Sequence, residues 1–298
     1  MRTICFLGDS ITRRGYWIAE IFEHLRKQGI VAYNCGVSGD SATGAISRLY
    51  SDCLCRTPDT VAVMFGMNDV GRDLYNEGRC DVEEKKAARI AKFEASMRTL
   101  LDMLRRTGVD IILCTPTPCD DVTANVTVVN TCNDGLAKCA EITRGLAKEF
   151  SLPCVDFFAY LRPLLGREYQ TLPDCVHPTP ESHHAMAQCF MRDLGWISEI
   201  DPTPFLPLNE QHQARFDAEQ GLREIHFIEW NQMYKERMSR KMTHADFIAL
   251  AESRLAAARE ADDQRQIGWY SNYLKIVENK LDYETALVQL TLEMAHRA

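Results

Sequence analysis

Residues 3–12 read Thr3-Ile4-Cys5-Phe6-Leu7-Gly8-Asp9-Ser10-Ile11-Thr12, a short apolar run that ends in a polar turn. The run predicts a buried strand, because it is apolar throughout and a glycine bounds it. Further runs of the same character lie at residues 30–34, 60–65, 110–114 and 153–157. Between the first two runs, apolar residues from Trp17 to Leu25 repeat at helical spacing, and Gly29 ends the predicted helix. Later helices are expected at residues 82–106, 133–150 and 181–194.

This alternation of strands and helices predicts the fold class. Strands that are apolar throughout are typical of a parallel sheet buried between two layers of helices. We therefore expect an α/β fold over residues 1–198, a three-layer α/β/α sandwich with a five-stranded parallel sheet. Ligands of such folds bind beyond the carboxyl ends of the strands, so a motif directly after a strand is a candidate functional segment.

The carboxyl-terminal third of the chain has a different pattern. Prolines at positions 202, 204 and 207 predict an extended connector over residues 199–209. Residues 210–298 show only helical patterns, with apolar residues three and four apart in 247–258, 267–281 and 283–294. We expect an all-helical extension that packs on the first domain, caps its pocket or forms the interface of a homo-oligomer.

Composition narrows the functional classes. Hydrophobic residues make up 46% of the 298 residues and charged residues 26%, which excludes fibrous and disordered proteins. The net charge of −8 disfavours a nucleic-acid partner, which requires a cationic surface. No apolar run approaches the roughly 18 residues of a membrane span. Because no signal peptide precedes the first strand, we expect a cytoplasmic protein with reduced cysteines. Cys53-Leu54-Cys55 lacks the second cysteine or histidine pair that a metal site requires, so we expect no metal there.

Candidate chemistry lies in segments that follow the predicted strands. They are Gly8-Asp9-Ser10, Gly36-Val37-Ser38-Gly39, Gly66-Met67-Asn68-Asp69 and, before the last helix, Asp174-Cys175-Val176-His177. Each is a common turn sequence when taken singly. Together they bring a hydroxyl, glycine N–H groups, an amide and an imidazole with a carboxylate to one edge of the predicted sheet.

These residue types suit nucleophilic acyl transfer. A serine hydroxyl is too weakly acidic to attack an ester unaided, so it needs a neighbouring base and donors for the oxyanion. In a loop, a carboxylate three residues before an imidazole can accept its Nδ1–H and leave Nε2 free for the serine proton. A glycine lets a backbone N–H approach the reacting oxygen, and an asparagine amide supplies another donor.

In order and spacing, the segments resemble the motifs of the SGNH hydrolases, also called the GDSL esterase and lipase family, over roughly residues 3–195. The resemblance implies a flavodoxin-like SGNH fold and a catalytic set of Ser10, Asp174 and His177. It implies an oxyanion hole formed by the backbone N–H groups of Ser10 and Gly39 and the side chain of Asn68. Asp9 and Asp69 match motif positions as well, and we expect them to brace their loops. No metal and no organic cofactor are implied.

The expected function is hydrolysis of short-chain carboxylic esters through an acyl-enzyme, with acetylated carbohydrates as one candidate substrate class. The family resemblance leaves lysophospholipase and thioesterase activity open. A different class also stays open, a non-catalytic binding or assembly module built on a hydrolase scaffold. The expected partner of the site is a small-molecule ester.

Overall fold

The computed structural model describes residues 2–75, 82–123, 132–201 and 244–263, together with 266–267, 270–271 and 274. The chain divides into two compact units. The first unit comprises residues 1–49 and 58–218, and the second comprises residues 50–57 and 219–298. The predicted connector, residues 199–209, lies almost wholly outside the described residues. The domain boundary at residue 198 therefore stays a prediction.

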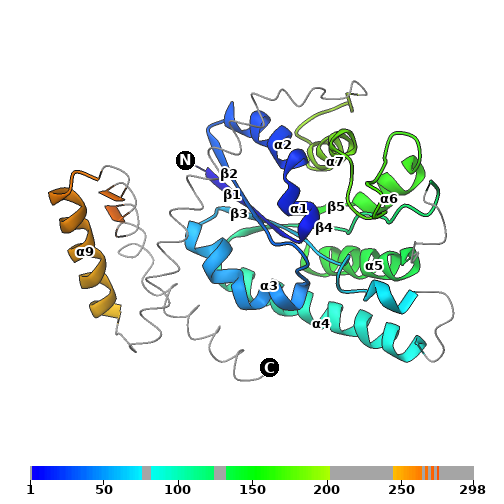
Figure 1. Cartoon of the computed structure of the whole chain (residues 1–298), viewed down its shortest axis with the longest axis horizontal. Coiled ribbons are helices and arrows are strands. Elements are labelled where there is room, and N and C mark those ends of the chain that lie inside the picture. Colours follow the sequence, from blue (N-terminus) through cyan, green and yellow to red (C-terminus); the bar gives the residue numbers. More distant parts are fainter. Residues whose placement is uncertain are drawn as a thin grey trace. The chain divides into compact units, whose positions relative to one another are not determined.

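The first unit is built on a five-stranded parallel sheet, shown edge-on in Figure 1. Its strands stand in the order β2 (Ile30–Gly36), β1 (Arg2–Gly8), β3 (Thr60–Met64), β4 (Asp110–Cys114), β5 (Cys154–Val155). The middle of β1, from Ile4 to Leu7, is at most 3% exposed, as expected for a strand covered on both faces. The next strand in the chain, β2, lies on one side of β1, and the following strand, β3, lies on its other side. The strand order therefore reverses at β1, and ligands of such sheets bind at this switch point.

Helices cover both faces of the sheet, and the predicted three-layer α/β/α sandwich is confirmed. One layer contains α2 and α7, and the other contains α3, α4 and α5 (Figure 1). The helices of the first unit are α1 (Ser10–Arg14), α2 (Tyr16–Arg26), α3 (Ala42–Arg48), α4 (Glu83–Thr107), α5 (Asn133–Phe150), α6 (Phe157–Leu161) and α7 (Pro180–Asp193). The first unit also contains the short helical turns η3 (Arg72–Tyr75) and η4 (Arg162–Leu164). Two further turns, η1 (Leu49–Cys53) and η2 (Leu54–Arg56), fall almost wholly in residues 50–57 of the second unit.

Aromatic side chains join the first strand to the helical layer above it. The ring centroids of Phe6 and Trp17 lie 5.2 Å apart, and those of Trp17 and Phe190 lie 5.6 Å apart. All three rings are almost fully buried. Burying side chains of this size contributes about 2–3 kcal/mol each, so β1, α2 and α7 form one rigid block beneath the loops that follow β1.

The structure differs from the sequence prediction at two places near the sheet. The fifth strand, expected over residues 153–157, ends at Val155, because the Asp156 side chain accepts a hydrogen bond from the Ala159 N–H and begins α6. Helix α1, directly after β1, was not predicted. With five residues it is too short to show a hydrophobic period.

The described part of the second unit contains α9 (His244–Glu260). Ala251, Leu255 and Ala258 on this helix are buried, which confirms the helical pattern expected from Phe247 to Ala258. The patterns expected at 267–281 and 283–294 lie mostly or wholly outside the described residues. Among the described helices, none has both the length and the apolar composition of a membrane span.

Candidate active site

The candidate site lies at the carboxyl edge of the sheet, where three neighbouring strands end side by side. In the sheet register, Gly8 at the end of β1 stands beside Gly36 of β2 and Met64 of β3. The segments with Ser10, Gly39 and Asn68 leave the sheet directly after these positions. The register therefore explains how residues distant in sequence come to line one pocket.

Ser10, His177 and Asp174 form a chain of short hydrogen-bond contacts. The Ser10 Oγ lies 2.7 Å from His177 Nε2, and His177 Nδ1 lies 2.6 Å from an Asp174 carboxylate oxygen. This order of groups allows an imidazole to take the serine proton while the carboxylate fixes its tautomer and orientation. The arrangement can therefore activate the hydroxyl as a nucleophile.

The Asp174 carboxylate also organises its own loop. Its second oxygen accepts hydrogen bonds from the backbone N–H groups of Val176 and His177, at 3.0 and 2.9 Å. Partial burial acts to raise the pKa of Asp174, but the hydrogen bonds from His177 and Val176 outweigh it and lower the pKa below the ordinary value. The carboxylate is consequently ionised near neutral pH and can stabilise a protonated imidazole.

Backbone and side-chain donors face the same pocket. Ser10 is the first residue of α1, so its N–H has no partner within the helix. Gly39 adopts a left-handed conformation with φ of 77°, and no acceptor for its N–H is found in the part of the chain that the structure describes. The Asn68 amide donates one hydrogen bond to the Asp40 carbonyl at 2.7 Å, which leaves its second N–H for a ligand. These groups could together stabilise an oxyanion.

Two glycines let α1 lie directly on the strand ends. A Cβ atom at Gly8 would come within 2.1 Å of the Thr12 Oγ1, and one at Gly36 within 2.2 Å of the Arg13 backbone nitrogen. Such contacts are too short for any side chain at either glycine. The absence of a Cβ at both positions therefore fixes how closely the helix that carries Ser10 approaches the sheet.

Arg48 in α3 ties the loops of the site together. Its guanidinium donates to the Asp40 carboxylate at 2.6 Å, to the Cys35 carbonyl at 2.8 Å and to the Gly8 carbonyl at 2.9 Å. One side chain thus links the ends of β1 and β2 to the loop that carries Gly39. Arg48 could not be identified from the sequence, because it stands outside every motif and its partners meet only in the folded sheet.

Asp9 and Asp69 brace their loops, as the sequence predicted. Asp9 accepts a hydrogen bond from the Ile11 N–H, and Asp69 accepts from the N–H groups of Ala42 and Gly66. Burial raises the pKa of Asp9 to about 7 and that of Asp69 to about 6. These carboxyl groups therefore carry less negative charge near the site than their number suggests.

The pocket over these residues has a volume of about 520 Å³. It is lined by Ser10, Arg13, Arg14, Ser38, Gly39, Asn68 and His177, so the sequence-predicted Gly39 and Asn68 lie beside the serine and the histidine. Asp174 stands behind His177. Arg13 and Arg14 are part of its wall. Arg72 lies beside the Asp174 loop, at 3.4 Å from the Asp174 carbonyl.

Two histidines of α7, His183 and His184, pack against other parts of the first unit. His183 is 1% exposed, and its ring lies 5.4 Å from that of Tyr16. His184 contacts the Glu20 carboxylate at 3.1 Å and the Asp201 carbonyl at 2.8 Å. Neither ring contacts Ser10.

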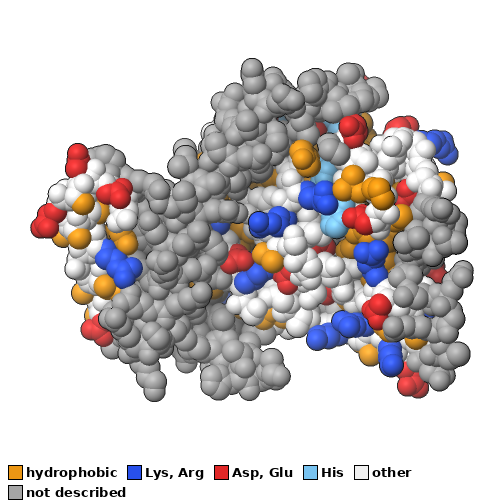
Figure 2. All heavy atoms as spheres, viewed as in Figure 1, with side chains coloured by type: hydrophobic (Ala, Val, Ile, Leu, Met, Phe, Trp, Pro, Cys, Tyr) orange, Lys and Arg blue, Asp and Glu red, His pale blue; other side chains and the backbone are white. Residues whose placement is uncertain are grey.

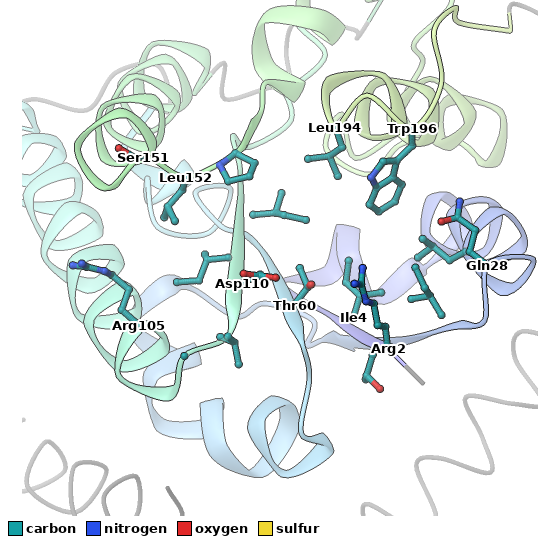
Figure 3. A pocket seen from close by; sticks show the side chains of 18 residues that line it. Arg2, Ile4, Gln28, Thr60, Arg105, Asp110, Ser151, Leu152, Leu194 and Trp196 are labelled. Atoms are coloured by element: carbon teal, nitrogen blue, oxygen red, sulfur yellow. The ribbon is translucent and has the colours of Figure 1, made fainter. Parts of the chain in front are cut away.

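A second pocket, of about 640 Å³, lies at the opposite edge of the sheet. Figure 3 shows that Thr60 and Asp110, at the starts of β3 and β4, stand in its centre, with Arg105 on one side and Trp196 on another. No histidine is among the described residues that line it. It therefore lacks an imidazole base for a serine, and the carboxyl-edge pocket is the better candidate for acyl transfer.

Comparison with known proteins gives consistent results. A model of the GDSL-like lipase/acylhydrolase family matches residues 6–185. An acetylxylan esterase from Geobacillus stearothermophilus is 26% identical in an alignment of 217 positions, and the match covers 65% of this chain and 95% of that protein. The crystal structure of an acetylxylan esterase from Geobacillus stearothermophilus has a TM-score of 0.51 and 25% identity, covering 65% of this chain and 94% of that one.

A gut microbial diltiazem-metabolizing enzyme has a TM-score of 0.58 and 22% identity, over 65% of this chain. The match covers 47% of that enzyme, so this chain spans about half of its length. This similarity supports the fold alone.

Proposed function

We propose that Ser10 attacks an ester carbonyl and carries the acyl group. The premise is that this chain belongs to the GDSL-like lipase/acylhydrolase family and is a carboxylic ester hydrolase. The observation that carries the proposal is the chain of contacts from Ser10 Oγ to His177 Nε2 at 2.7 Å and from His177 Nδ1 to Asp174 at 2.6 Å. These distances are those expected of a serine, its general base and the group that orients the base.

The proposed reaction has two steps. In the first, His177 Nε2 takes the proton of Ser10 as the Ser10 oxygen bonds to the ester carbon, and the carbonyl oxygen becomes an oxyanion. The same imidazole then gives its proton to the alcohol oxygen as the ester C–O bond breaks. In the second step, His177 takes a proton from water, the water oxygen bonds to the acyl carbon, and the proton returns to Ser10 as the acid leaves.

The oxyanion forms where the site presents its donors. We assign its stabilisation to the backbone N–H groups of Ser10 and Gly39 and to the free N–H of the Asn68 amide. Loss of one such donor typically lowers kcat by about 10²–10³-fold. Asp174 acts by holding the tautomer of His177 and by balancing the positive charge that the imidazole gains.

For the substrate, we propose short-chain esters, with acetylated carbohydrates as the leading class. The relative named as an acetylxylan esterase supports this choice. The lining residues support it too, because none of the described ones is an aliphatic side chain that could hold a long acyl chain. Lysophospholipid and acyl thioester hydrolysis remain the alternatives within the family.

A fluorophosphonate probe tests the nucleophile. Wild-type protein should be labelled and should hydrolyse 4-nitrophenyl acetate, whereas Ser10→Ala should lose labelling and at least about 10⁴-fold in kcat. Ser38→Ala is the matched control, since Ser38 is a second serine in the wall of the same pocket. Labelling that survives in Ser10→Ala but disappears in Ser38→Ala would refute the assignment.

The substrate class and the binding-module alternative need separate measurements. A panel of acetylated xylo-oligosaccharides, lysophospholipids and acyl thioesters should give the highest kcat/KM with the acetylated sugars. A higher value with either other class would replace the proposed one. A folded wild-type protein that neither labels nor hydrolyses any ester would instead favour a non-catalytic binding role.

A further inference from the structure

The catalytic pocket has a cationic wall in a protein whose net charge is −8. Arg13 and Arg14 both line the pocket beside Ser10 and His177. Figure 2 shows basic side chains next to the histidines on this face of the molecule. Within the described part of the chain, neither guanidinium group has a carboxylate partner. Both arginines are exposed, so water can reach them, and their shared feature is that they line the pocket without a carboxylate to neutralise them.

Capping of helix α1 does not explain them. Basic residues in a last helical turn often bind the final carbonyl groups. Here the Asn34 side-chain amide donates to the carbonyls of Thr12 and Arg13, at 2.9 and 3.1 Å. Gly15 follows the helix in a left-handed conformation with φ of 74°. The carbonyl groups of Thr12 and Arg13 are therefore satisfied without the guanidinium groups.

Internal charge pairing does not explain them either, because the acidic groups around the pocket have other partners. Asp40 pairs with Arg48 at 2.6 Å, and Asp174 pairs with His177. Asp9 is buried and bonded to the Ile11 N–H, and its pKa is raised to about 7. These carboxylates therefore do not neutralise the two exposed guanidinium groups that line the pocket.

The position of the pair is set by the same contacts that set the nucleophile. Ser10, Arg13 and Arg14 belong to one helix, and residues three and four apart on a helix are neighbours, with Cβ atoms roughly 5–6 Å apart. The close approach of Arg13 to Gly36 holds the backbone of the pair against β2. A guanidinium group can therefore reach a substrate group within about one side-chain length of the reacting carbonyl.

Arg14 and the general base His177 line the same pocket. Arg14 also acts on the buried His183, whose pKa is lowered to about 3, first by burial and then by the positive charge of Arg14. The departing alcohol must lie at His177 to receive its proton. A guanidinium group in the wall of the same pocket can therefore reach the alcohol part of the ester.

We propose that this pocket selects acyl esters whose alcohol carries a carboxylate or a phosphate, held by Arg13 and Arg14. The proposal rests on the proposed function and specifies its substrate class, such as an acylated hydroxy acid, uronic acid or sugar phosphate. Arginine suits this role, because its planar donors bind a carboxylate or phosphate through two parallel hydrogen bonds. The two positive charges also attract anionic substrates to a protein whose net negative charge otherwise repels them.

Matched esters test the proposal. The probes are 4-acetoxybenzoate and 4-acetoxyphenyl phosphate, compared with neutral 4-acetoxybenzamide, each rate being corrected for its rate of hydroxide-catalysed hydrolysis. Wild-type protein should show a kcat/KM at least about tenfold higher for one or both anions, as expected for a hydrogen-bonded charge pair. The anion with the larger ratio identifies the natural group. Raising the salt concentration from about 0.02 to 0.5 M should lower the ratio.

Variants then assign the preference to the two arginines. The combined Arg13→Gln and Arg14→Gln variant should have a ratio near one, and the corresponding lysine variant should keep part of the preference. Arg106→Gln is the control, since Arg106 is an exposed arginine of α4 that pairs with Asp102, and it should keep the wild-type ratio. The ratio is internal to each protein, so a partly unfolded preparation does not distort it.

Two results would overturn the proposal: a wild-type ratio near one for both anions, or a wild-type ratio that persists in the double glutamine variant. Either result leaves the proposed function standing if the neutral ester is hydrolysed and Ser10 is labelled. Failure of the proposed function is distinct, because wild-type protein would then hydrolyse neither neutral nor anionic esters and would not react with the fluorophosphonate.

Discussion

Replacing Asp9 with asparagine should make the protein more stable, and by an amount that grows with pH. Asp9 is 2% exposed and precedes the proposed nucleophile. Burial raises its pKa from 3.8 to about 7, although the hydrogen bond from the Ile11 N–H opposes this change, and Asp69 and Asp40 add to it. Asparagine has nearly the same shape, can keep the bond from Ile11 and never ionises, so it isolates the effect of the charge.

The magnitude follows from the two pKa values. Between pH 3.8 and about 7 the native state holds a proton on Asp9 that the unfolded state has released. Stability is therefore lost as the pH rises through this window. The window spans about three pH units, and one unit corresponds to about 1.4 kcal/mol, so ionisation of Asp9 costs at most about 4 kcal/mol at pH 8. Asp69 has the same tendency, but it is present in both proteins and largely cancels in the comparison.

Urea unfolding at pH 4, 6 and 8, followed by circular dichroism, measures the effect. Asp9→Asn and wild type should have similar free energies of unfolding at pH 4. The variant should gain on wild type with increasing pH, by about 3–4 kcal/mol at pH 8. Asp102→Asn, at an exposed carboxylate of α4, should stay within about 0.5 kcal/mol of wild type throughout. A difference between Asp9→Asn and wild type that does not change with pH would refute the reasoning.

Three further substitutions have expected outcomes. Gly36→Ala places a Cβ 2.2 Å from the Arg13 nitrogen, so it should lower the free energy of unfolding by about 2–3 kcal/mol in urea; a loss below about 0.5 kcal/mol would contradict the packing argument. His183→Phe removes a buried imidazole whose pKa is about 3 rather than 6.5. The native state resists protonation of His183 between pH 6.5 and 3, so wild type loses stability as the pH falls through this window. The free energy of unfolding of the variant should therefore rise relative to wild type, by up to about 5 kcal/mol at pH 3. Equal loss of stability in acid for the two proteins would contradict this. Asn68→Ala should lower kcat for 4-nitrophenyl acetate by about 10²-fold and leave KM within about threefold, whereas an effect on KM alone would exclude an oxyanion role.

Much of the fold was predictable because buried parallel strands leave a clear sequence pattern. Residues Ile4 to Leu7 are apolar without interruption, and the sheet buries both of their faces. The end of the fifth strand was not predictable, because it depends on the side chain of Asp156 bonding to the N–H of Ala159. The same residue could equally have stood in a loop after a longer strand. Local capping thus decides boundaries that periodicity leaves open.

The candidate site was predictable to the extent that it follows strand ends. Gly8 and Gly36 align in the register, so the segments that carry Ser10 and Gly39 necessarily emerge together. Arg48 was not predictable in this way. Its three acceptors lie on Asp40, Cys35 and Gly8, and only the paired strands bring these within reach of one side chain. Long-range polar contacts of this kind leave no local pattern in a single sequence.

The short helix α1 connects the rate of the proposed reaction to its proposed selectivity. Ser10 begins this helix and Arg14 ends it, so a displacement of α1 would move the nucleophile and the two arginines together. The helix is held from below by the close approach of Gly36 to Arg13 and at its end by Asn34. A side chain added at Gly36 should therefore weaken anion preference and turnover in parallel, whereas loss of the guanidinium groups should weaken the preference while the nucleophile stays in place. Comparing these two kinds of variant separates the positioning of the helix from the charge that it carries.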